Sequence, residues 1–278
     1  MAGAYTYRPA LFFALAYALS WIAWFSAVYA GQTGVAAILQ LAGIAGPTIA
    51  ALLLVLTSGS SPLKRDFRDR LLNLRRIKPH YAVVAVVLPL TVILASIAIS
   101  LLFGGTADQF RISGGANLLA MVILTMAIAP LLEEIGWHGY GVDSLRAGMG
   151  MLKTTLVFGL LWSAWHAPAA LIAGTYQNEL LRMENPLFLA NFFVSIVPAA
   201  FIANWFYYKN DRSILGAVLM HSMLNAASVL IAAGQVAKCI ATLLYAAVVV
   251  ALVVTDAEFR QGPRNFIGGG DNAVRENG

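Results

Sequence analysis

Long apolar stretches dominate the pattern of hydrophobic and polar positions along this chain. Eight of them approach the ~20 residues that a helix needs to cross the hydrocarbon core of a bilayer. They lie near residues 10–30, 35–57, 80–103, 117–138, 153–173, 187–208, 213–233 and 238–255. The pattern predicts an all-α, polytopic helical membrane protein, with about eight transmembrane helices in a single domain over residues 1–255.

The first of these stretches has a second interpretation, because Val28-Tyr29-Ala30 resembles the cleavage site of a signal peptide. The apolar run is longer than the core of a signal peptide, however, and only Arg8 precedes it as a basic residue. We therefore expect an uncleaved first span.

Composition supports the membrane class. Hydrophobic residues make up 60% of the chain and charged residues 11%, and the mean hydropathy is +0.76, which is too apolar for a soluble domain of 278 residues. The single cysteine, Cys239, excludes an internal disulfide and a thiolate metal cage. Beyond residue 256 the chain becomes polar and rich in glycine, so we expect residues 256–278 to form a disordered cytoplasmic tail.

The basic residues indicate an orientation in the membrane. Residues 64–78 contain seven Lys or Arg against two Asp, with apolar residues between them, as in an amphipathic helix on an anionic membrane surface. The positive-inside rule places this loop in the cytoplasm, and counting spans from it places both termini there as well. The net charge of +5 is thus explained by contact with the lipid bilayer, which is the expected partner, and no binding to nucleic acid is expected.

Only two of the thirteen acidic residues, Glu133 and Glu134, lie inside the apolar stretches. A charged group in hydrocarbon is costly, and such a residue is therefore a candidate for function. His166 and His221 also lie within apolar stretches and are possible basic partners. The chain is predicted to bury a cluster of acids and histidines in the membrane.

The acidic pair opens the segment Glu133–Tyr140 at the end of the fourth predicted span. On a helix Glu134 and His138 share a face, whereas Glu133 points about 100° away. The two carboxylates are therefore expected to have different roles. Pro130 removes a backbone hydrogen bond and predicts a kink that opens polar space. The alternative is an acidic pair that only reaches for the membrane surface.

Two further motifs place polar groups in the fifth and seventh spans. His166 follows Trp162 by four residues, and His221 and Asn225 are four apart on one helical face. The alternative for His166 is a packing role, and for His221 and Asn225 it is a hydrogen bond that joins two helices. At 1.5 Å per residue, Glu133, His166 and His221 reach depths that one cavity open to the cytoplasm can share.

These groups suit peptide hydrolysis without a covalent intermediate. A carboxylate and an imidazole that share a water make a general base, and a second histidine with an asparagine can stabilise the oxyanion. Serine catalysis at Ser163 or Ser222 is a rival scheme, but neither serine lies in a nucleophile elbow. A proton-coupled transporter is a further alternative.

The motifs together resemble the CAAX protease and bacteriocin-processing family of intramembrane endopeptidases, which includes the type II CAAX prenyl endopeptidases. The family pattern is Glu-Glu-x-x-x-Arg, then aromatic-x-x-x-His, then His-x-x-x-Asn or Asp, all on transmembrane helices. The match runs from about residue 123 to 227, within a protease-like core over about 117–233. The resemblance implies that Glu133 with His166 activates water, and that His221 with Asn225 forms the oxyanion hole.

The resemblance also assigns supporting residues. Glu134 is expected to pair with the residue at the arginine position, which is His138 here, and a neutral imidazole would weaken that contact as pH rises. Trp137, Trp162 and Trp165 are expected to wall the cavity.

The implied substrate is a membrane-anchored or lipidated protein or peptide, cut near the cytoplasmic face, with no cofactor and no metal. A zinc-dependent protease using the same residues is the alternative mechanism, since two histidines, a glutamate and water match a catalytic zinc site. A scaffold or immunity protein without turnover is the alternative function.

Overall fold

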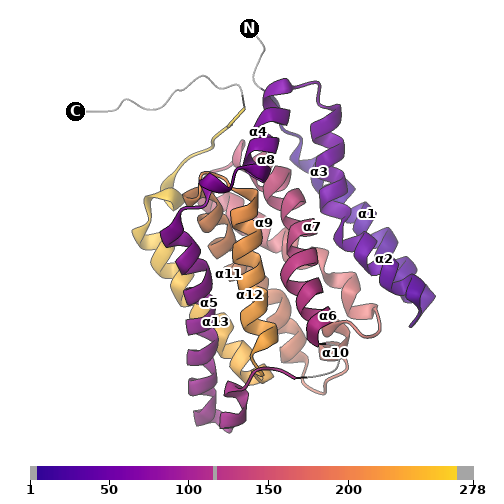
Figure 1. The fold of residues 1–278 in the computed structure, drawn as a ribbon, viewed down its shortest axis with the longest axis vertical. Helices are drawn as coiled ribbons and strands as arrows, with labels where there is room; N and C mark the ends of the chain where they lie inside the picture. The colour runs from indigo at the N-terminus through magenta and orange to yellow at the C-terminus, as the bar shows by residue number, and fades with distance from the viewer. Residues whose placement is uncertain (1–4, 115–117, 268–278) are drawn as a thin grey trace.

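Helices form the entire framework of the protein in the computed structural model, which describes residues 5–114 and 118–267 (Figure 1). Within these ranges the only β-type pairing is an isolated bridge between Ile112 and Ile231. The predicted all-α class is confirmed for the described residues.

The helices follow one another along the chain with short connections. The α-helices are α1 (Pro9–Ala30), α2 (Gly34–Ile44), α3 (Gly46–Thr57), α4 (Ser61–Leu72), α5 (Pro79–Ser100), α6 (Leu118–Ile123), α7 (Ala129–Gly136), α8 (Val142–Arg146), α9 (Met151–Trp165), α10 (Tyr176–Leu181), α11 (Pro186–Lys209), α12 (Ile214–Leu230) and α13 (Gln235–Thr255). The 3₁₀-helices are η1 (Leu74–Arg76), η2 (Leu101–Phe103), η3 (Ala107–Phe110), η6 (Ala167–Leu171) and η7 (Ala257–Arg260), and the π-helices are η4 (Leu124–Ile128) and η5 (Trp137–Gly141).

Four of the described helices, α1, α5, α11 and α13, are long and apolar enough to cross a membrane by themselves. The pair α2 and α3 passes the same test as one span bent by 46°. The other three predicted spans are shorter or interrupted helices. The fifth, for example, contains only the 15 residues of α9. Pro168, which lacks an N–H, then lies in the 3₁₀-helix η6. The structure thus supports several spans, and the number eight goes beyond it.

The basic loop after α3 forms the predicted amphipathic helix, α4, with one correction. Lys64, Arg65 and Arg68 are exposed, as a helix at a membrane surface requires, and Leu63 and Phe67 are buried beneath them. Arg70 belongs to the seven basic residues predicted for this surface, but its side chain is fully buried. It points into the bundle because acceptors are available there, as described below.

The two ends of the described chain meet at the same end of the bundle as α4 and α8 (Figure 1). The backbone N–H of Tyr5 donates to the carbonyl of Ile267 at 3.2 Å, and that of Arg264 donates to the carbonyl of Arg146 at 2.9 Å. Residues 256–267, which belong to the predicted tail, therefore lie against the bundle in the structure. The Arg212 guanidinium lies over the aromatic ring of Phe266, 3.9 Å from the ring centroid. This cation–π contact explains part of the docking. Residues 268–278 lie outside the described residues.

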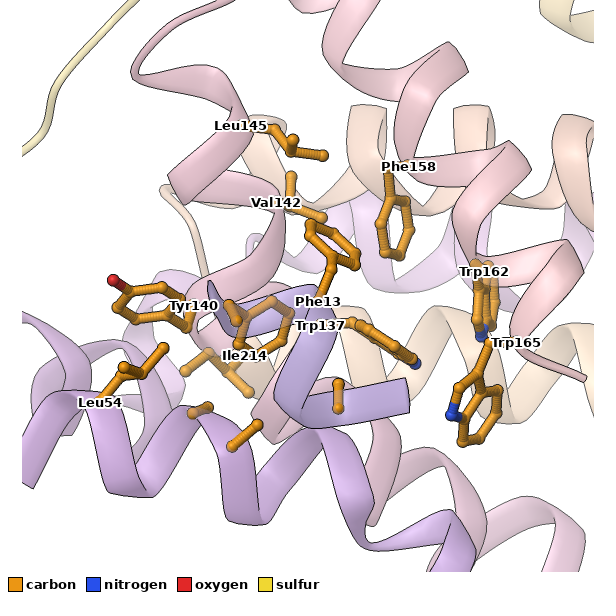
Figure 2. Close-up of a cluster of buried hydrophobic side chains, with 14 of the residues drawn as sticks. Phe13, Leu54, Trp137, Tyr140, Val142, Leu145, Phe158, Trp162, Trp165 and Ile214 are labelled. Atoms are coloured by element: carbon orange, nitrogen blue, oxygen red, sulfur yellow. The ribbon is translucent and has the colours of Figure 1, made fainter. Parts of the chain in front are cut away.

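An aromatic cluster fills the space between α1, η5 and α9 (Figure 2). Its largest members, Trp137, Phe158 and Trp165, are almost completely buried. The same rings form one side of the polar cluster that the sequence predicts. The core and the candidate site are therefore parts of one packed unit.

Candidate active site

Glu133 and Glu134 lie on α7, between the two π-helices of the fourth predicted span. The kink expected at Pro130 takes the form of the π-helix η4, in which the N–H of Ala129 bonds to the carbonyl of Leu124, five residues earlier. Pro130 has no N–H to continue the regular ladder, so a wider turn is tolerated here. Both glutamates are thereby held inside the bundle, 6% and 0% exposed.

Glu134 joins two helices through two histidines. One carboxylate oxygen, Oε2, contacts His138 Nδ1 one turn further along the helix, and the predicted contact is therefore present. The other oxygen, Oε1, accepts a hydrogen bond from His221 Nδ1 on α12 at 2.7 Å. The sequence did not predict this second contact. Both oxygens of Glu134 are occupied, which leaves this carboxylate unsuited to act as a base.

His138 faces an acceptor at each ring nitrogen. Nδ1 contacts the Glu134 carboxylate, and Nε2 lies 2.9 Å from the side-chain oxygen of Asn204 on α11. The amide nitrogen of Asn204 donates in turn to Thr155 on α9 at 3.2 Å. His138 stands at the position that arginine has in the pattern described above, and like arginine it contacts side-chain oxygens on two sides.

We expect His138→Gln to lower kcat/KM for peptide cleavage about 10- to 100-fold, because hydrogen bonds to charged groups contribute roughly 1.5–3 kcal/mol. Arginine at this position, as in His138→Arg, can also donate to the Glu134 carboxylate and is expected to recover most of that loss. Steady-state kinetics of both variants would test this, with His80→Gln at an exposed histidine as the control. Wild-type kinetics for His138→Gln would contradict the role.

Trp162 connects Glu133 with His166. Its indole N–H donates to Oε2 of Glu133 at 2.9 Å, and its backbone carbonyl accepts from His166 Nδ1 at 2.8 Å. A carbonyl can only accept, so Nδ1 carries the proton and Nε2 of neutral His166 keeps its lone pair. Among the described residues no hydrogen bond joins Glu133 directly to His166. The two groups instead share Trp162 as their common neighbour.

His221 and Asn225 lie one turn apart on α12, as predicted. The His221 ring packs edge-on against Trp162 with centroids 5.2 Å apart. The Asn225 amide donates to the backbone carbonyl of Thr125 in η4 at 2.8 Å. The alternative interpretation of Asn225, a hydrogen bond between two helices, is therefore present in the structure. An amide has two N–H groups, so a second donor remains for another partner.

Arg70 holds the backbone beside this cluster, a role that no sequence motif predicts. Its guanidinium donates to the carbonyls of His138 and Gly139, each at 2.9 Å, where the π-helix η5 departs from regular hydrogen bonding. It also donates to the Tyr207 hydroxyl at 2.7 Å. Arg70 therefore fixes the turn that carries His138.

Acidic partners balance the charge of Arg70. Asp66 accepts from Arg70 at 2.6 Å, and fully buried Asp143 lies 3.4 Å away. Arg212, which precedes α12 with a left-handed φ of 62°, bridges Asp66 and Asp143 at 2.9 and 2.6 Å. Burial alone would raise the pKa of Asp143, but Arg212 and Arg70 outweigh it and hold that pKa below its ordinary value. The network ties α4, α8 and α12 together at one end of the site.

Across the residues that the structure describes, no group of three His, Cys, Asp or Glu side chains has the geometry to hold a metal ion. Cys239 lies apart as a free, half-buried thiol on α13.

Comparison with known proteins agrees with the motifs. The family model described as "Type II CAAX prenyl endopeptidase Rce1-like" matches residues 115–227. CAAX prenyl protease 2 of Methanococcus maripaludis is 34% identical over 263 residues, which cover 92% of this chain and 97% of that protein. The chain belongs to the type II CAAX prenyl endopeptidase family. The predicted resemblance and the predicted endopeptidase class are thereby confirmed.

Membership in the type II CAAX prenyl endopeptidase family also settles the coarse localisation. With several long apolar helices, the chain is an integral, multi-pass membrane protein. The stretch that matches the family model contains Glu133, Glu134, His138, His166, His221 and Asn225. Arg70 lies outside that stretch, which is why a motif comparison alone does not find it.

Proposed function

We propose that this protein hydrolyses a peptide bond near the cytoplasmic membrane face, in a membrane-anchored or lipidated protein with a CAAX-like end. The proposal rests on the difference in hydrogen bonding between the two glutamates. Glu134 is occupied by His138 and His221, whereas Glu133 accepts a hydrogen bond from the Trp162 indole and from no histidine in the described chain. Glu133 is therefore the carboxylate free to take a proton from water.

The reaction then follows from the positions of the side chains. Glu133 accepts a proton from water, with the Nε2 lone pair of His166 as second acceptor, and the water oxygen attacks the substrate carbonyl. His221, paired with Glu134, and the second N–H of Asn225 donate to the oxyanion. When the C–N bond breaks, the proton held by Glu133 passes to the leaving amine.

This mechanism needs no metal ion. The use of both Glu134 oxygens in hydrogen bonds to histidines supports this proposal. We further propose eight spans, with the shorter helices α9 and α12 crossing beside the longer ones, and both termini in the cytoplasm. The basic, exposed face of α4 lies at the same end of the bundle as residues 5 and 267, the two ends of the described chain, and supports that orientation.

The test uses purified protein in lipid nanodiscs and a fluorescence-quenched peptide with a farnesylated cysteine near its C-terminus. The same peptide without the lipid is the control substrate, and mass spectrometry locates the cut. We expect cleavage of the lipidated peptide only, and no change with 1,10-phenanthroline. Loss of cleavage on chelation with recovery in zinc would replace the mechanism. A folded protein that cleaves neither peptide would favour a scaffold.

A further inference from the structure

Two of the six tryptophans have an unpaired indole N–H, and both lie at the candidate active site. Trp137 and Trp165, 0% and 1% exposed, have no hydrogen-bond acceptor for Nε1 in the described chain. Leaving a buried donor unpaired costs roughly 1–3 kcal/mol, so each such group calls for an explanation.

The other four indoles all have acceptors. Trp162 donates to Glu133 at 2.9 Å, and Trp205 donates to Asp256 at 2.9 Å. Trp21 and Trp24 donate to the backbone carbonyls of Trp165 and Gln40 at 3.0 and 3.1 Å. Unpaired indoles are therefore not a general property of this fold. They are confined to the place where chemistry is proposed.

The two unpaired indoles face the same small region. Their rings meet edge to face with centroids 5.4 Å apart, and the ring of Trp165 also packs against His166 at 4.7 Å. The Trp137 side chain also neighbours Glu133, but its indole N–H has no hydrogen bond to that carboxylate. In Figure 2 the nitrogens of Trp137, Trp162 and Trp165 lie on the sides of the rings that face one another.

The surroundings limit what the acceptor can be. Both indoles are buried too deeply for a substrate side chain or a peptide group to reach the N–H without repacking of the aromatic cluster. A water molecule is small enough, and it offers lone pairs to the indoles and hydrogens to the carboxylate of Glu133. Its place would be between Glu133 and His166, the two groups assigned to water activation.

We propose that the indole N–H groups of Trp137 and Trp165 bind the oxygen of the attacking water and stabilise the hydroxide formed from it. The inference rests on the proposed function. When Glu133 takes the proton, the O–H electron pair stays on oxygen and gives hydroxide three lone pairs. The two indoles hold two of them, and the third attacks the substrate carbonyl. Trp137 and Trp165 are thus catalytic residues rather than only walls of a cavity.

The experiment removes each donor while keeping the ring. Trp137→Phe and Trp165→Phe are compared with variants that carry benzothienylalanine at the same positions, which keeps the bicyclic shape and lacks the N–H. We expect kcat to fall about 100-fold for loss of one donor to a developing anion, with KM little changed. The acidic limb of the pH profile of kcat/KM is expected to move to higher pH, because hydroxide becomes harder to form.

Trp24→Phe is the matched control, because Trp24 packs against Trp165 with centroids 4.5 Å apart and uses its N–H elsewhere. It is expected to change thermal stability and to leave the pH profile unchanged. The second measurement needs no turnover: ¹⁵N-edited NMR of the indole N–H groups is expected to show contacts with water at Trp137 and Trp165, and none at Trp24.

Each outcome bears on a different claim. Absence of water contacts at both indoles would overturn the binding site. Water contacts together with unchanged kcat and pH profile in the benzothienylalanine variants would overturn the catalytic role. A wild-type protein that binds water at both indoles but cleaves no lipidated peptide would overturn the proposed function on which this inference depends.

Discussion

Replacement of Glu133 by Gln is expected to lower kcat/KM about 10³-fold, within the range that general bases contribute. Glutamine keeps the shape of the side chain and can still accept from the Trp162 indole through its amide oxygen, as Glu133 does at 2.9 Å. It cannot take a proton from water. The measurement is cleavage of the farnesylated peptide in nanodiscs, together with the thermal unfolding temperature of each variant.

The control for this prediction is Glu179→Gln, which makes the same chemical change at an exposed position in α10. It is expected to leave the kinetics unchanged. The proposed base would be wrong if Glu133→Gln retained more than about a tenth of wild-type activity, because loss of a general base costs at least about 10²-fold. Comparison of the termini of membrane peptides in cells that express wild type or Glu133→Gln would extend the test to natural substrates.

Replacement of Arg70 by Met is expected to lower the free energy of unfolding by about 3–5 kcal/mol, the usual result of removing one partner from a buried ion pair. Arg70 donates to two carbonyls of η5 and to Tyr207, and it neutralises part of the charge on Asp66 and Asp143. Methionine fills a similar volume but satisfies none of these acceptors. Chemical denaturation in detergent, followed by tryptophan fluorescence, measures the change.

Arg68→Met on the exposed face of α4 is the matched control, with an expected change near zero, as for most substitutions at exposed positions. Arg70→Lys separates charge from geometry, because lysine keeps the charge but cannot reach two carbonyls with a planar fork. We expect it to be intermediate. Equal stability of Arg70→Met and Arg68→Met would show that the buried network contributes little.

The parts of the site that are local in sequence could be predicted. The i, i+4 spacing of Glu134 and His138 fixes a shared helical face, and the contact follows from helix geometry alone. The spacing of His221 and Asn225 likewise predicts that they lie one turn apart on a helix, and both lie on α12. The pattern of apolar stretches likewise identified the helices, because the cost of exposed backbone groups in lipid leaves few other structures.

The contacts that depend on tertiary packing could not be predicted. Nothing in the sequence pairs Glu134 with His221, which is 87 residues away, or brings Asn204 to His138, 66 residues away. The basic composition of residues 64–78 predicts a surface position for Arg70, which is correct for Lys64, Arg65 and Arg68 and wrong for Arg70. Only the position of α4 against η5 shows that one arginine of the group points inward.

The π turns within the fourth predicted span could not be predicted for a related reason. Apolar composition indicates where the chain is buried, but it does not distinguish a regular helix from one interrupted by π turns. Similarly, the polar composition beyond residue 256 suggested disorder, whereas contacts with Tyr5, Arg146 and Arg212 hold residues 256–267 in place. Docking of a polar segment on a folded surface leaves little trace in its own composition.

The two π-helices on either side of α7 have a consequence for the way this family can vary. A π turn accommodates one residue more than a regular turn, and each extra residue offsets the angular phase of all that follows by about 100°. α7 lies between two such offsets. The direction in which its side chains point around the helix axis is therefore not set by the helical phase of the flanking segments. An insertion or deletion outside α7 can therefore be accommodated by a change in the π turns of η4 or η5. Glu133 and Glu134 then keep their orientation while the sequence of the flanking segments changes.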